Sequence, residues 1–162
     1  VVAGDTIINY ALSEGIAIEV AKTFTSITLV TMIGGYLLGI VAIPKYMKQE
    51  VFLSISAILG IAFVSATLIF SGYVSVFFVA ALGLANAIMW PAIWPLAIRE
   101  LGNFTRQGSS LLIMAIAGGA FLPLVYGQIA DMYSVQIGYS ILLVCYGFIL
   151  YYSIFGHKKN VW

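Results

Sequence analysis

The sequence predicts an all-α, polytopic membrane helical bundle with five full transmembrane helices and a shorter first helix. Hydrophobic residues make up 62% of the 162 residues and charged residues only 8%, against about 25% in soluble domains. Long apolar stretches cover residues 24–43, 51–70, 74–98, 108–130 and 137–156, and the polar residues lie in short connections. At roughly 1.5 Å per residue, each stretch is long enough to cross a hydrocarbon layer of roughly 30 Å.

The first apolar segment, residues 1–12, is too short to cross a membrane alone, because its helix would measure roughly 18 Å. It follows neither an initiating Met nor a basic segment, so it does not have the form of a signal peptide. The segment is either a truncated first helix of the bundle or a re-entrant or interfacial piece, and we favour the truncated helix.

Two polar residues, Asp5 and Asn9, lie one helical turn apart in this segment, with Thr6 and Tyr10 beside them. A carboxylate in an apolar helix is unfavourable and by default marks an ion, proton or substrate pathway. The alternative is that Asp5 pairs with a cation outside the present sequence. Because no Lys or Arg lies within the five long stretches, we favour a place for Asp5 and Asn9 in the pathway.

The basic residues orient the bundle. Of the seven Lys and Arg residues, only Lys22 falls in the connections 13–23, 71–73 and 131–136. The other six lie on the opposite side: Lys45, Lys48, Arg99, Arg106, Lys158 and Lys159. The positive-inside rule places that side, and the C-terminus, in the cytoplasm. We therefore expect a multi-pass protein of the inner, cytoplasmic membrane.

Small residues recur four positions apart, on one helical face, in three of the stretches: Gly35 and Gly39, Gly83 and Ala87, Ala115 and Gly119. Such pairs allow close packing of helices in lipid. The adjacent pair Gly118 and Gly119 also weakens its helix locally, which predicts a site of bending.

The third long stretch holds the most informative polar and aromatic residues. Pro91 and Pro95 remove helical hydrogen bonds and free the carbonyls four residues before them. Asn86, Trp90 and Trp94 recur every four residues and share much of one face. An amide beside aromatic rings suits a sugar, whose hydroxyls hydrogen-bond while its C–H face stacks. The alternatives are helix packing for Asn86 and Trp90, and for Trp94 a place at the membrane interface, which we favour for Trp94.

Several classes of function are disfavoured. The membrane stretches contain no Ser and His pair, no Cys and His cluster and no carboxylates paired at helical spacing, so we expect no enzyme, catalytic residue, metal or cofactor. Cys145 has no partner for an intrachain disulfide, and we assign no role to His157. The net charge of +1 argues against a nucleic-acid partner. A six-helix structural subunit without transport is a further alternative, against which the polar residues Asp5 and Asn86 argue.

Several motifs together resemble one family of transporters. Residues 102–114, 117–123 and 127–131 resemble the eleventh helix of the fucose:proton symporter family, within the major facilitator superfamily. Residues 89–94 resemble its tenth helix, in which Pro follows an aromatic residue. Residues 5–10 are similar to the seventh helix of the glucose and galactose transporters in that group. The resemblance covers the chain in order.

The resemblance implies that residues 1–162 form the C-terminal half of a twelve-helix sugar transporter whose N-terminal half is absent. It implies a sugar site at mid-membrane between the halves, with uptake driven by a coupling cation, H+ or Na+. We expect the sugar-binding residues to be Asn86, Trp90, Asn9 and Asp5, with Trp90 at the aromatic position of the tenth helix. Gly35 stands where many superfamily members carry Arg. A carrier of drugs or peptides is the alternative within transporters.

Overall fold

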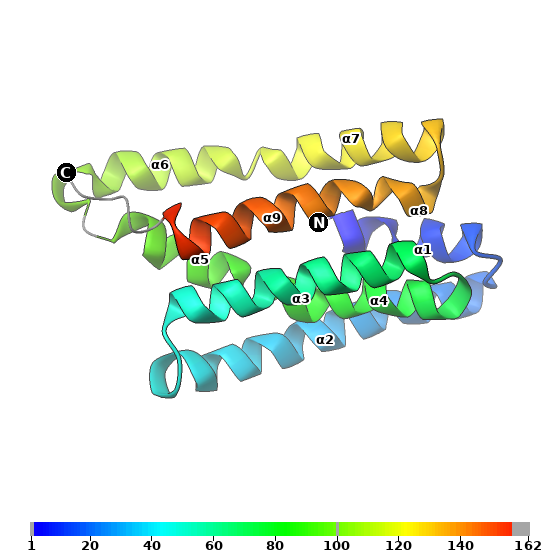
Figure 1. Ribbon diagram of the computed structural model, residues 1–162, viewed down its shortest axis with the longest axis horizontal. Helices are drawn as coiled ribbons and strands as arrows, with labels where there is room; N and C mark the ends of the chain where they lie inside the picture. The colour runs from blue at the N-terminus through cyan, green and yellow to red at the C-terminus, as the bar shows by residue number, and fades with distance from the viewer. Residues whose placement is uncertain (1, 100, 157–162) are drawn as a thin grey trace.

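The computed structural model describes residues 2–99 and 101–156, and these form a bundle of helices aligned along one long axis (Figure 1). In chain order the helices are α1 Val2–Ser13, α2 Ile18–Lys45, α3 Gln49–Ile69, α4 Gly72–Asn86, α5 Met89–Ile98, the 3-10 turn η1 Gly102–Phe104, α6 Thr105–Ala115, α7 Gly118–Met132, α8 Val135–Gly138 and α9 Ser140–Ile154. The described residues contain no strand.

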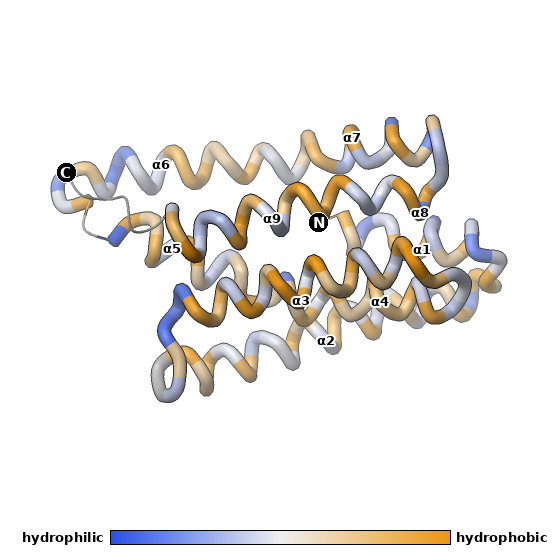
Figure 2. The backbone as a smooth tube through the Cα atoms, in the orientation of Figure 1, coloured by the Kyte–Doolittle hydropathy of each residue, from blue (hydrophilic) through white to orange (hydrophobic). Residues whose placement is uncertain are grey.

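Five segments are long and apolar enough to cross a membrane: Ile18–Ile43, Gln49–Ile69, Gly72–Ile98, Gly102–Met132 and Val135–Ile154. Each contains most or all of one predicted stretch, and α1 is the shorter first helix with 12 residues. Hydrophobic residues follow the helices along their length and hydrophilic ones gather at the ends (Figure 2). The predicted all-α membrane bundle is confirmed.

Two of these spans are discontinuous. The third breaks between α4 and α5, at Ala87 and Ile88, because Pro91 offers no N–H and its ring collides with the carbonyl of Ala87. The fourth breaks between α6 and α7, at Ile116 and Ala117, where the backbone makes tight bonds to residues three positions earlier. The break directly precedes Gly118, so the predicted weak point of this helix is confirmed.

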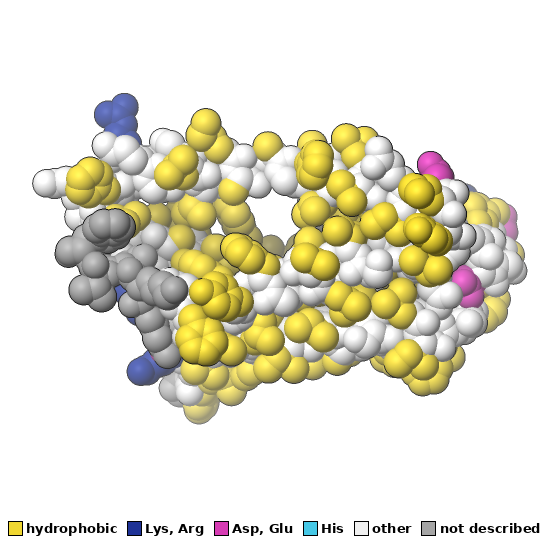
Figure 3. Space-filling view, turned by 45° about the horizontal axis from the view of Figure 1, so that its top comes forward, with side chains coloured by type: hydrophobic (Ala, Val, Ile, Leu, Met, Phe, Trp, Pro, Cys, Tyr) yellow, Lys and Arg dark blue, Asp and Glu magenta, His cyan; other side chains and the backbone are white. Residues whose placement is uncertain are grey.

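Charge separates the two ends of the bundle. The connections α2–α3 and α5–α6 lie at one end, and α1–α2, α3–α4 and α7–α8 lie at the other (Figure 1). On the face that Figure 3 shows, basic side chains lie at the first end and acidic ones at the second, while Glu50 also lies at the first end. This is the asymmetry that the sequence predicts, although Lys158 and Lys159 lie outside the described residues. The assignment of the basic end to the cytoplasm stays a prediction.

Glycines set the close approach of α2 and α4. A Cβ added at Gly83 would lie 2.6 Å from Thr31 Oγ1 and against the backbone carbonyl of Thr28. One added at Gly35 would lie 2.7 Å from the Cβ of Ala87. Since such separations are shorter than van der Waals contact, only glycine fits at these positions. The predicted packing role of Gly35, Gly83 and Ala87 is therefore confirmed.

Candidate functional site

The two helix breaks border one cavity near the middle of the bundle. Its volume is about 410 Å³. The junction of α4 and α5, the junction of α6 and α7, α9 and the start of α1 form its walls. The lining residues are Val2, Ala3, Asn86, Met89, Trp90, Ala115, Gly118, Gly119, Leu122, Pro123, Leu142, Cys145, Tyr146 and Ile149. Interrupted helices expose backbone polar groups, which membrane proteins tolerate where they line a cavity.

Asn86 supplies the amide of this cavity. Its side-chain oxygen Oδ1 accepts a hydrogen bond of 2.8 Å from the hydroxyl of Tyr146, on α9. Tyr146 is buried, whereas Asn86 is only partly buried and lines the cavity. The bond therefore joins α4 to α9 beside the helix break. It also holds the carbonyl oxygen of the amide toward Tyr146.

Trp90 supplies the aromatic face. Its side chain is 44% exposed and lines the same cavity as Asn86. Its ring also contacts that of Trp94, with the ring centroids 5.6 Å apart. The structure thus brings Asn86 and Trp90 to one cavity, as their spacing predicts, whereas Trp94 contacts the Trp90 ring and is not among the lining residues.

Asp5 and Asn9 lie apart from this cavity wall. Both side chains are exposed on α1, whereas the cavity residues that α1 contributes are Val2 and Ala3. The sequence spacing places the four polar residues of α1 side by side, but the helix divides them between two faces. Thr6 Oγ1 lies 2.8 Å from the Tyr139 hydroxyl, and the buried Tyr10 hydrogen-bonds Ser75. A rotation of about 100° per residue separates these inward positions from the outward ones.

Sequence reasoning missed several residues of the cavity. Tyr146 was not singled out, and its hydroxyl within an apolar helix was the one available signal. Cys145, for which the sequence analysis assigns no functional role, lines the cavity and is half-buried. Ala115 and Gly119, expected to pack against a helix, also line it, so their small side chains leave space there.

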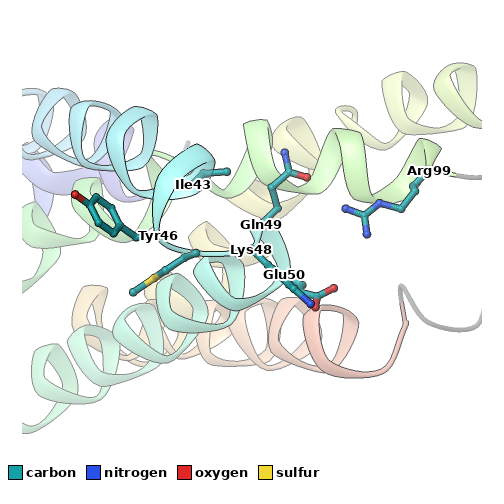
Figure 4. A pocket seen from close by; sticks show the side chains of 7 residues that line it. Ile43, Tyr46, Lys48, Gln49, Glu50 and Arg99 are labelled. Carbon is teal, nitrogen blue, oxygen red and sulfur yellow. The ribbon is translucent and has the colours of Figure 1, made fainter.

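A second hollow lies at the basic end of the bundle (Figure 4). Its volume is about 700 Å³, and it is lined by residues of the α2–α3 connection and by Arg99 at the end of α5. Arg99 lies across the hollow from Gln49 and Glu50 (Figure 4). Since charged side chains of both signs line it, this hollow differs in character from the mostly apolar cavity at the centre.

Curated proteins similar to this chain are sugar transporters by name. The chain is 31% identical to the glucose/galactose transporter of Brucella abortus over 159 residues, 96% of this chain and 38% of that protein. It is 32% identical over 131 residues to the putative glucose/galactose transporter of Helicobacter pylori, 78% of this chain and 32% of that protein. It is 28% identical over 127 residues to the L-fucose-proton symporter of Escherichia coli, 77% of this chain and 29% of that protein. No protein-family model matches the chain.

A solved structure shows the same fold. The crystal structure of a Major Facilitator Superfamily transporter, FucP, in the outward conformation matches with a TM-score of 0.90 and 24% identity. The match covers 95% of this chain and 38% of that one. The chain thus spans about 38% of the first relatives' length, and the matches lie in the C-terminal part of the relatives. These relatives are transporters, not enzymes.

Proposed function

We propose that this chain forms the C-terminal six-helix half of a sugar transporter. The chain belongs to the family of the glucose/galactose transporters and L-fucose-proton symporters, and it has the major facilitator fold. One observation carries the proposal: the central cavity joins Asn86 and Trp90 between two interrupted helices. Interrupted helices that meet near the bilayer midplane are where transporters bind their substrates. The names of the relatives support sugar as the substrate.

The chemistry of the cavity suits one face of a sugar. The exposed ring of Trp90 provides a surface on which C–H groups stack. The Asn86 amide provides hydrogen bonding, and the remaining lining is mainly apolar. At about 410 Å³ the cavity falls within the roughly 300 to 1,000 Å³ of ligand sites. The cavity is the part of the sugar site that the C-terminal half contributes, and the N-terminal half of the transporter completes the site.

Transport then proceeds by alternating access in symport with a cation, H+ or Na+. The two halves rock against each other around the shared site, and the break before Gly118 gives the fourth span a place to bend. The basic end faces the cytoplasm by the positive-inside rule. The carboxylate of Asp5 is exposed on α1 and points away from the rest of the bundle. In the complete transporter it can therefore take part in the cation pathway.

Labelling of Cys145 tests whether the sugar occupies this cavity. In the full-length transporter, we expect saturating sugar to slow alkylation of Cys145 by N-ethylmaleimide at least severalfold, because the thiol lines the cavity. Mass spectrometry of the peptide that contains Cys145 measures the rate, and Cys145→Ser gives the background. The protection should have the same concentration dependence as sugar uptake. Alkylation at an unchanged rate in saturating sugar would place the substrate elsewhere.

Substitution of Asp5 tests its place in the cation pathway. We expect Asp5→Asn in the full-length protein to fold normally but to lower uptake or to alter its pH dependence, since an amide keeps hydrogen bonding and loses the charge. Initial uptake rates in proteoliposomes between pH 5 and 8 measure this. The control is Asp131→Asn, the same change at an exposed position near the end of α7. An Asp5→Asn profile identical to wild type would remove Asp5 from the coupling pathway.

A further inference from the structure

An asparagine amide can present either of two opposite groups to a ligand. Its carbonyl oxygen accepts hydrogen bonds and its NH2 group donates two, yet the two orientations have nearly the same shape. The partner that holds the other end decides which group faces the ligand. At Asn86 that partner is the hydroxyl of Tyr146, which donates to Oδ1 at 2.8 Å.

Tyr146 is closely packed against a neighbouring helix. Its side chain is 3% exposed, and its ring lies against Gly60 on α3. A Cβ at Gly60 would lie 2.6 to 2.8 Å from three atoms of this ring. The glycine therefore leaves the space that the ring fills, at a position where α3 and α9 pack closely. The ring of Tyr146 is therefore packed against α3 on one side, with its hydroxyl on Asn86.

The direction of this hydrogen bond follows from the hydroxyl of Tyr146. Among the described residues, Asn86 Oδ1 is the acceptor recorded for this buried hydroxyl. If the amide were turned around, its NH2 group would donate to the phenol oxygen, and the phenol proton would lose the acceptor that Oδ1 provides. Since the loss of an acceptor by a buried donor is unfavourable, the orientation with Oδ1 toward Tyr146 and the NH2 group toward the cavity is favoured.

We propose that Tyr146 is a positioning residue that holds the Asn86 amide with its NH2 group toward the substrate, so that the site selects a sugar oxygen that accepts a hydrogen bond. This inference rests on the proposed function, since it concerns the same cavity. The Trp90 indole N–H is also a donor only. The two polar groups we assign to substrate binding thus favour an acceptor, while the ring of Trp90 receives the apolar face.

Sugar analogues separate a donating site from an accepting one. Replacing a sugar hydroxyl by hydrogen removes all hydrogen bonding, whereas replacing it by fluorine leaves only a weak acceptor. If the amide donates, then at one hydroxyl position the fluoro sugar binds the full-length transporter more tightly than the deoxy sugar. We expect a ratio of about three- to tenfold, the range of one net hydrogen bond. If Oδ1 faced the sugar, the fluoro sugar would bind no better than the deoxy sugar.

Two variants test the role of Tyr146 through this ratio. We expect Tyr146→Phe to bring the fluoro-to-deoxy ratio close to one, because the amide is no longer held in one orientation. Asn86→Asp should bring the ratio to one or below, because a carboxylate still accepts from Tyr146 but offers no donor. Tyr151→Phe is the matched control: it removes a hydroxyl from an exposed tyrosine of the same helix and should keep the wild-type ratio.

The outcomes distinguish this inference from the proposed function. A wild-type transporter that binds none of the sugars refutes the proposed function. Binding with a ratio of one or below at every hydroxyl refutes the inference alone. So does a folded Tyr146→Phe variant that keeps the wild-type ratio, since a purely structural role would weaken binding of all analogues alike. If Tyr146→Phe does not fold, Asn86→Asp decides, and its retention of the wild-type ratio would overturn the proposal.

Discussion

Trp90→Ala in the full-length transporter is expected to weaken sugar binding by roughly 1 to 3 kcal/mol, the contribution of one stacked aromatic ring. That corresponds to a dissociation constant about five to 150 times larger. The ring is 44% exposed on the central cavity, so its loss removes a binding surface and leaves the helix packing largely intact. Equilibrium binding of radiolabelled glucose, galactose and fucose to the purified protein measures the change.

Controls for Trp90→Ala separate binding from folding. Trp90→Phe keeps an aromatic face and should recover most of the affinity. Phe148→Ala removes a more exposed aromatic ring, 71% exposed, from the outer surface of α9, outside the cavity lining, and should bind sugar like wild type. Unchanged affinity of a well-expressed Trp90→Ala protein would remove Trp90 from the site. Loss of affinity in Phe148→Ala as well would point to a general effect on the bundle.

Local sequence signals predict the spans and indicate where the helices are weak. A proline acts on the carbonyl four residues before it, and the first interruption lies at Ala87, four residues before Pro91, although Pro95 and Pro123 lie inside continuous helices. The glycine pair directly follows the second interruption. The apolar runs predict the five spans because a membrane imposes their length. Each of these effects acts within a few residues along the chain.

The walls of the cavity were only partly predictable. Asn86 and Trp90 are four residues apart, so helical periodicity places them together. Tyr146 lies 60 residues from Asn86 in the sequence, and their contact depends on how α4 and α9 pack through α3. Periodicity within one helix carries no such information. The same limit applies to α1, where spacing groups Asp5 with Asn9 but does not reveal which face of the helix turns outward.

Gly83→Val is expected to destabilise the bundle more than any other single change considered above. The two helices α2 and α4 cross so closely at this position that a Cβ would lie against the Thr28 carbonyl and 2.6 Å from Thr31 Oγ1. Overpacking of a core ordinarily destabilises by roughly 1 to 3 kcal/mol and occasionally by more. Here the obstacle is backbone in a helix, which cannot move as a side-chain tip can, so the helices themselves must separate.

A separation of α2 and α4 would also displace the sugar site, because α4 ends at Asn86, one turn after Gly83. We expect Gly83→Val in the full-length protein to give little folded protein, seen as loss of the monodisperse peak in detergent and a melting temperature lower by several degrees. Gly147→Val is the matched control, since a Cβ at this helical glycine of α9 meets nothing within 4 Å. It should melt like wild type. Equal melting of the two variants would show that the close packing of α2 against α4 at Gly83 does not stabilise the bundle, and would contradict this account of how Asn86 is positioned.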